Sequence, residues 1–209
     1  TPGAESVLAA KLCLDGAWEK QAACSDWTYC NYGLCQDVLI DLPFDESPHR
    51  DLVEWWYWPG DVSDADGNVY GFELTFFYAG RLFGIPAWMI HAGVVDLATG
   101  EHQVNVWLDI YNPTEWPEPF VLESRDALVT REDDTYLMAA VAGDFAFELS
   151  LTDTQGPVYH GGNGSIRMST RTTDSFYYSR PRMDVSGILF RDGEPLTVTG
   201  EAWMDHQWG

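Results

Sequence analysis

From Leu196 to Trp208 the chain reads LTVTGEAWMDHQW, and this stretch indicates the fold class more clearly than any other. Successive side chains of a β-strand point to opposite faces. In a strand, one face of this stretch carries Leu196, Val198, Gly200, Ala202, Met204, His206 and Trp208. The other carries Thr197, Thr199, Glu201, Trp203, Asp205 and Gln207. We therefore predict a long, half-buried strand that directs His206 and Trp208 inward and Asp205 away from them.

The same alternation recurs upstream, in YGFELTFFYAG (Tyr70–Gly80). There Phe72, Leu74 and Phe76 alternate with Glu73, Thr75 and Phe77, and the pair Asp66-Gly67 ahead of them is a hairpin-turn signal. More short segments of this kind follow, separated by turn sequences. Many short antiparallel strands at such spacing predict an all-β protein, either a lipocalin-like antiparallel barrel or a barrel-like sandwich.

The composition restricts the partners. Acidic residues number 33 against 11 basic ones, which gives a formal net charge of −22. Phosphate binding needs a basic surface, so we expect no nucleic-acid partner. No apolar run reaches the roughly 18 residues of a transmembrane helix. Ten Trp, ten Tyr and ten Phe either fill the core or line an apolar pocket.

All four cysteines lie near the start of the chain, at Cys13, Cys24, Cys30 and Cys35. They form no CxxC pair, and their clustering favours two disulfides over a zinc site. Three pairings are open. We predict a short, disulfide-stapled leader over residues 1–40, a barrel domain over residues 41–209, and an exported protein. The Pro-rich segment DLPFDESPHRD (Asp41–Asp51) between them is interpreted as a linker.

Three segments hold candidate functional side chains. In EWWYWPG, a strand places Glu54, Trp56 and Trp58 on one face. A Glu in such an apolar pocket has a raised pKa and suits a general acid, whereas the structural alternative is a Glu that bonds Arg or backbone. His91, in WMIHAGVVD, is more typical of a core histidine than of a catalyst. His160, in HGGNGSI, precedes glycines that either admit a ligand or form a turn.

Motifs for common cofactors are missing: the sequence has no P-loop, no dinucleotide fingerprint, no GxSxG and no HExxH. The histidines are far apart along the chain, and their spacing supports no metal site. We therefore expect a protein without a cofactor or metal.

Six motifs in fixed order carry a family resemblance: EWWY, FELTFF, WMIHAGVVD, HGGNGSI, FYYSRPRMDVSG and VTGEAWMDHQWG. The ordered set resembles the lipocalin-like carotenoid 1,2-hydratase group (hydroxyneurosporene synthase and the related AttH-like proteins) from about Glu46 to Gly209. The resemblance implies an antiparallel barrel around a long apolar pocket, with isoprenoid or polyene ligands. The cysteine-rich leader is not part of the family pattern.

The resemblance also implies site residues. His206 and Trp208 match the motif that holds the functional His and Trp of the hydratases, and Glu54 joins them as a predicted catalytic residue. The residues expected to contact the ligand are Trp55, Trp56, His91, Trp203, Tyr177 and His160. The hydratases use a further Tyr and Asp in a second lipocalin-like half, which this sequence does not contain. A second lipocalin-like domain or chain is therefore an expected partner.

Three functions are compatible with these residues. The first, which we favour, is a hydratase: His206 or Glu54 protonates a C=C bond, Trp208 stabilises the cation and water attacks. The second is a non-catalytic carrier of a lipid or polyene in the same pocket. The third is a cyclase of the Diels–Alderase type, which folds a polyene by proximity and shape.

Overall fold

The computed structural model describes residues 11–14, 17–20, 28–31, 34–49, 53–82, 85–110, 120–168 and 174–209. The regular elements of these ranges are β-strands, with one 3-10 turn, η1 (Phe44–Glu46). None of the helical segments in these ranges is long or apolar enough to cross a membrane. The prediction of an all-β, antiparallel protein is confirmed.

Two small hairpins precede the main sheet. Strand β1 (Lys11–Leu14) pairs with β2 (Ala17–Lys20), and β3 (Thr28–Asn31) pairs with β4 (Leu34–Asp37). The side chains of Cys13, Cys24, Cys30 and Cys35 lie outside the described part of the chain. The disulfides, and the boundary between a leader and a barrel domain, therefore remain predictions.

One antiparallel sheet forms the body of the molecule, in the order β8-β7-β6-β5-β16-β15-β12-β11-β10-β9. Its strands are β5 (Glu54–Ser63), β6 (Val69–Leu82), β7 (Ile85–Asp96), β8 (His102–Asp109), β9 (Val121–Ser124), β10 (Ala127–Glu132), β11 (Thr135–Ala142), β12 (Phe145–Asp153), β15 (Asp174–Arg191) and β16 (Glu194–Trp208). The short strands β13 (Val158–Tyr159) and β14 (Ser165–Arg167) pair with β15. The last strand in sequence therefore lies in the middle of the sheet, next to β5.

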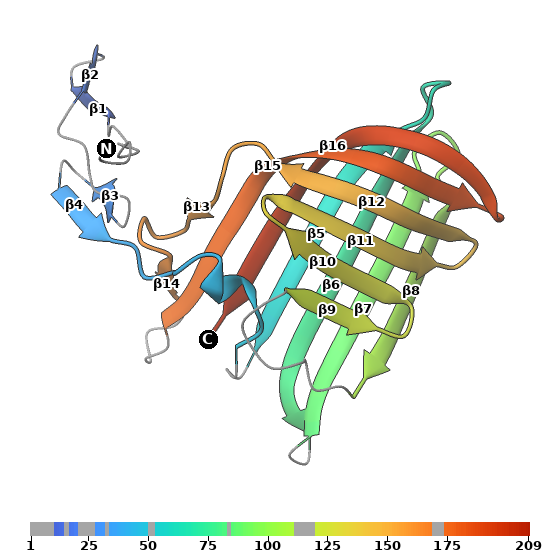
Figure 1. The fold of residues 1–209 in the computed structure, drawn as a ribbon, viewed down its shortest axis with the longest axis horizontal. Coiled ribbons are helices and arrows are strands. Elements are labelled where there is room, and N and C mark those ends of the chain that lie inside the picture. Colours follow the sequence, from blue (N-terminus) through green and yellow to red (C-terminus); the bar gives the residue numbers. More distant parts are fainter. Residues whose placement is uncertain are drawn as a thin grey trace, which may run out of the picture.

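The sheet curls until its two edges meet, and this makes it a nearly closed barrel. Figure 1 shows β9–β12 crossing in front of β5–β8. Side chains join the edges: the Trp107 indole of β8 donates a 2.9 Å hydrogen bond to the Ser124 hydroxyl of β9, which donates to Asp109. Across the same closure, Asn105 of β8 donates to the Val141 carbonyl of β11 at 3.1 Å.

The predicted strand faces are confirmed. On β16, Val198, Ala202, Met204, His206 and Trp208 are buried, whereas Thr197, Thr199, Glu201 and Trp203 are exposed. On β5, Glu54, Trp56 and Trp58 are each 0% exposed. Phe72, Leu74 and Phe76 of β6 join the same core, so the sequence alternation alone fixed the inward set of these three strands.

Glycine 200 allows β16 to approach β5 closely. A Cβ added to Gly200 would lie 1.9 Å from the Asp61 carbonyl oxygen and 2.7 Å from Val62 Cα, and backbone atoms cannot yield as a side chain can. Gly93 of β7 is a matched control, because an added Cβ would lie 3.2 Å from Glu73 Cγ, at a side chain that can move.

We expect Gly200→Ala to lower the free energy of unfolding by about 1–3 kcal/mol or more, the usual range for overpacking. Gly93→Ala should change it by less than about 1 kcal/mol. Urea denaturation of both variants measures the difference, and equal losses would contradict the close approach of the two strands.

Candidate functional site

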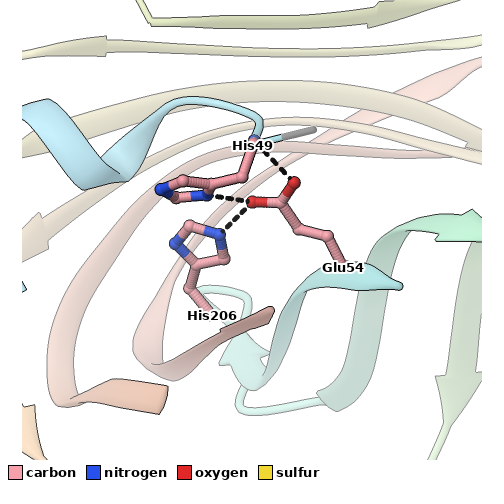
Figure 2. Close-up of side chains that lie close together, drawn as sticks. All are labelled: His49, Glu54 and His206. Carbon is pink, nitrogen blue, oxygen red and sulfur yellow. Dashed lines mark hydrogen bonds and ion pairs between the residues drawn. The ribbon is translucent and has the colours of Figure 1, made fainter. Parts of the chain in front are cut away.

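The candidate site lies on the inner face of the barrel, where β5, β16 and the segment before β5 meet. The register pairs Trp208 with Glu54 and His206 with Trp56, which puts both predicted catalytic residues of β16 beside Glu54. The third participant, His49, comes from the segment that the sequence indicated to be a linker. Figure 2 shows the two imidazoles on the same side of the Glu54 carboxylate.

The Glu54 carboxylate accepts three hydrogen bonds. His206 Nε2 lies 2.8 Å and His49 Nδ1 2.7 Å from the same oxygen, Oε1. The His49 backbone N–H donates to the other oxygen, Oε2, at 2.7 Å. Glu54 and His206 are both 0% exposed, so protein donors replace the water that a carboxylate would otherwise bind.

Aromatic rings hold the two imidazoles. His49 stacks on the Trp208 indole with ring centroids 4.2 Å apart and an interplanar angle of 6°. His206 stacks on Trp56 at 4.4 Å and lies 4.5 Å from Trp208. On its other side, Trp208 stacks with Phe176 at 5.5 Å. These contacts restrict both imidazoles and leave Trp208 packed between rings.

The charges of the cluster differ from the sequence expectation. Burial raises the pKa of Glu54, but the bonds from His206 and His49 outweigh burial and lower that pKa below its usual value. The predicted raised pKa of Glu54 is therefore wrong, because the sequence did not reveal two histidines on one carboxylate. Burial lowers the pKa of His206, as predicted, and the bond to Glu54 does not restore it.

His49 carries the proton of the cluster. Burial lowers its pKa, but hydrogen bonds with Asp45 and Glu54 reverse this effect and raise the pKa to about 9. At neutral pH the cluster therefore contains a His49 imidazolium, a Glu54 carboxylate and a neutral His206. The neutral ring donates from Nε2 to Glu54, so its Nδ1 accepts a hydrogen bond from the Tyr178 hydroxyl, 3.2 Å away.

Two histidines and a carboxylate are also a common metal-ligand set, and their ligand atoms lie within 4.8 Å of one another. Two nitrogens bound to a tetrahedral zinc at about 2.0–2.1 Å lie roughly 3.3 Å from a third ligand atom. The N–O distances of 2.7 and 2.8 Å are those of charge-assisted hydrogen bonds. In this hydrogen-bonded arrangement the three groups can act as an acid–base group.

A second buried carboxylate, Glu46 of η1, lies nearby. It accepts hydrogen bonds from Tyr136, from Arg180 at 2.9 Å and from Arg131 at 3.3 Å. Its backbone carbonyl accepts the Trp56 indole N–H at 3.0 Å, which ties η1 to the wall of the first cluster. The Tyr178 hydroxyl lies between the two groups, because it bonds His206 Nδ1 and also interacts with Glu46. Burial, and then the Glu46 charge, raise the pKa of Tyr178 well above its usual value.

A cavity of about 920 Å³ opens beside Glu46. Leu42, Pro43 and Phe120 form its apolar wall, and Glu46, Arg131 and Arg180 line its polar side. None of Glu54, His206 and Trp208 lines it. The sequence predicted an apolar pocket walled by tryptophans. Instead, the indoles of Trp56 and Trp208 stack on the imidazoles of His206 and His49 and do not line the cavity.

The other predicted contact residues lie on the outer face of the barrel, away from His206. Trp55 stacks on Phe77, His91 is paired in register with Val106, and Trp203 is 39% exposed. Strand alternation explains this, because Trp55 and Trp203 lie next in sequence to inward-facing residues and therefore point to the opposite face. Their assignment as ligand-binding residues stays a prediction, and none of the three lines the cavity beside Glu46.

Tyr177 and His160 form a separate group with Asp205 on the outer face. Their rings stack at 3.7 Å, His160 Nε2 lies 2.7 Å from the Ser179 hydroxyl, and both Ser179 and Tyr177 donate to Asp205. Asp205 is thus an acceptor for neighbouring hydroxyls and has no contact with His206, as its place on the strand indicated. His160 fixes the β13–β14 segment to β15.

Sequence analysis missed four residues of the site: Glu46, His49, Tyr178 and Arg180. Glu46 and His49 lie in a polar, Pro-rich segment that has no periodicity. Tyr178 and Arg180 fall within FYYSRPRMDVSG, one of the six motifs of the family resemblance. On β15 they share one face, and Tyr177 lies on the other. Pairing of β15 with β16 would have indicated Tyr178, because the register places it opposite the inward-facing His206.

The curled antiparallel sheet with an acid–base group on its inner strands defines a lipocalin-like barrel protein. The chain belongs to the AttH-like family, whose model matches residues 35–209. The matched range includes the last three residues of β4, the whole barrel and every member of the buried cluster. The family predicted from the six ordered motifs is confirmed.

Solved structures resemble the chain, among them the following two. An AttH of Nitrosomonas europaea (NE1406) is 30% identical with a TM-score of 0.73, and the match covers 81% of this chain and 55% of that one. Kievitone hydratase of Nectria haematococca is 16% identical with a TM-score of 0.69, covering 81% and 52%, and shows the shared fold. The chain thus spans about half the length of either structure. Among proteins of curated function, none matches the chain in sequence.

The buried ion pair of Glu46 should support the fold more than a surface pair does. Glu46→Gln removes the carboxylate that Arg131 and Arg180 share and leaves Arg180 with Asp153 as its remaining acidic partner, so it should cost about 3 kcal/mol. Glu201→Gln is the control: its pair with Arg182 is exposed and should contribute less than about 1 kcal/mol. Denaturant midpoints measure both, and similar midpoints would contradict the assigned role of Glu46.

The charge of His49 should make stability depend on pH. Its pKa is raised from 6.5 to about 9 on folding, so its contribution is complete below pH 6.5 and is lost as pH rises towards 9. The loss should be on the order of 2–3 kcal/mol. His49→Gln should flatten the unfolding free energy between pH 6.5 and 9. A slope in this variant as steep as that of the wild type would show that another group causes it.

Proposed function

We propose that this chain is the water-activating half of a hydratase, which adds water across a C=C bond of an isoprenoid-like ligand. One observation carries the proposal: a neutral, fully buried His206 donates to a carboxylate through Nε2 and keeps its Nδ1 for a proton. This is the arrangement in which a carboxylate orients a histidine base and stabilises the imidazolium that forms. The AttH-like family membership and the hydratase fold likeness agree with it.

The ligand would occupy the cavity beside Glu46. Its apolar part would lie against Leu42, Pro43 and Phe120, and the attacking water would lie on the polar side. Hydration places a proton on one carbon and the water oxygen on the other, and the second water proton leaves to a base. Tyr178 is buried behind Glu46 of the cavity wall and bonds it, so the water proton would reach Tyr178 past Glu46 as Tyr178 passes its own proton to His206 Nδ1. Glu54 would balance the new charge.

The acid that protonates the carbon is a separate group in this proposal. Glu54 has a lowered pKa and His49 a pKa of about 9, so both are poor donors to an alkene. We assign the acid to the half of the related structures that this chain does not span. A second lipocalin-like domain or chain would supply it. Trp208, packed between His49 and Phe176, serves to position imidazoles in this scheme.

The test incubates isoprenoid alkenes in water labelled with ¹⁸O, with a full-length protein that contains this chain and the second lipocalin-like domain or chain. Mass spectrometry should detect products that carry one labelled water. Because a general base contributes about 10²–10⁴ in rate, His206→Gln should lower the rate at least about 100-fold. The outer-face control His91→Gln should leave it within about twofold. Undiminished hydration by His206→Gln would overturn the assignment.

A non-catalytic carrier is the second candidate. The observation that favours it is the packing: Glu54 and His206 are 0% exposed and do not line the cavity. For a carrier, apolar ligands would bind with no labelled product in any variant. Native mass spectrometry of ligands that co-purify with the chain distinguishes this outcome from turnover.

A further inference from the structure

His49 occupies a position in the site that the proposed reaction does not explain. It touches every other member of the cluster: its Nδ1 and backbone N–H bond Glu54, its ring stacks on Trp208, and its centroid lies 5.8 Å from that of His206. Asp45 accepts from its other nitrogen at 3.4 Å. A residue needed only to fill space would require neither two bonds to one carboxylate nor a second acidic partner.

Glu54 has one charge to share between two imidazoles. Both rings approach the same oxygen, Oε1, and Figure 2 shows them side by side. Two imidazolium ions at 5.8 Å repel each other, so the carboxylate stabilises one of them as a cation but not both. His49 is the more favourable place for the positive charge, because Asp45 also faces it. Its side chain is 16% exposed, whereas that of His206 is 0% exposed.

We infer that the positive charge of His49 adds to burial in keeping His206 neutral, and so helps to make His206 the base of this site. His49 is then a positioning residue: it touches neither the cavity nor the reacting atoms, and it acts through Glu54 and His206. This inference gives a role to the segment before β5 and rests, for its chemical meaning, on the proposed hydration.

The ionisable groups that face the pair are few among the described residues. His206 faces Glu54 of β5, Tyr178 of β15 and His49, with the Glu46 charge acting from η1. His49 faces Asp45, Glu54 and His206. Of these, Glu54, Glu46 and Asp45 are acids that favour a charged histidine. Burial opposes a proton on His206 most strongly, and His49 is the facing cation that opposes it further.

The test compares two substitutions by NMR titration of the His206 ring in the full chain. His49→Gln keeps a hydrogen-bond donor to Glu54 but removes the charge. His49→Arg restores a permanent cation that can also stack on Trp208. For unit charges about 6 Å apart, we expect His49→Gln to raise the pKa of His206 by roughly one to two units. His49→Arg should raise it by less than half as much.

Equal shifts of the His206 pKa in both variants would show that His49 only excludes water from the site. An unchanged His206 pKa in His49→Gln would show that the charge of His49 has no effect on it. Either result overturns the inference. The NMR readout needs no substrate, so it decides the role of His49 even where the hydration proposal fails. Where hydration is found, the acid limb of its pH profile should move upward in His49→Gln by the same amount as the pKa of His206.

Discussion

The charge of Glu54 is the constraint on which the rest of the site depends. A carboxylate that is completely buried loses its hydration, and it stays ionised only where protein donors replace that water. Here His206, His49 and the His49 backbone N–H provide the donors. The aromatic rings around them exclude water, which strengthens these bonds and removes any alternative partner. One carboxylate thus fixes two imidazoles, and through them Trp208 and Trp56.

The segment before β5 joins this cluster to the cavity. Glu46 bonds Arg131, Arg180 and Tyr136 inside the barrel, while three residues later His49 bonds Glu54. A surface connection would leave both carboxylates to solvent. Because this segment instead packs against residues of the inner face, two buried ion-paired groups lie next to each other, with the Tyr178 hydroxyl between them.

Much of the fold could be predicted from periodicity. The inward faces of β5, β6 and β16 followed from alternation, since a strand exposes every second side chain to the same side. The segment FVLESRDALVTRED (Phe120–Asp133) forms β9 and β10, and its alternation is too short, with a turn between the strands, to predict them. Of the site, His206, Trp208, Glu54 and Trp56 were found. Trp55, His91 and Trp203 were grouped with them only because they share motifs, and strand geometry places them outside.

The sequence by itself determined the strand faces, the family and the inward direction of His206, because these depend on residues close together in the chain. The tertiary structure decided the charges. His49 and Glu54 lie 152 residues or more from His206, and only the pairing of β16 with β5 brings them to one oxygen. A pKa depends on burial and on the charges within a few ångströms. Those neighbours come from strand order and from the closure of the barrel, which no local pattern encodes.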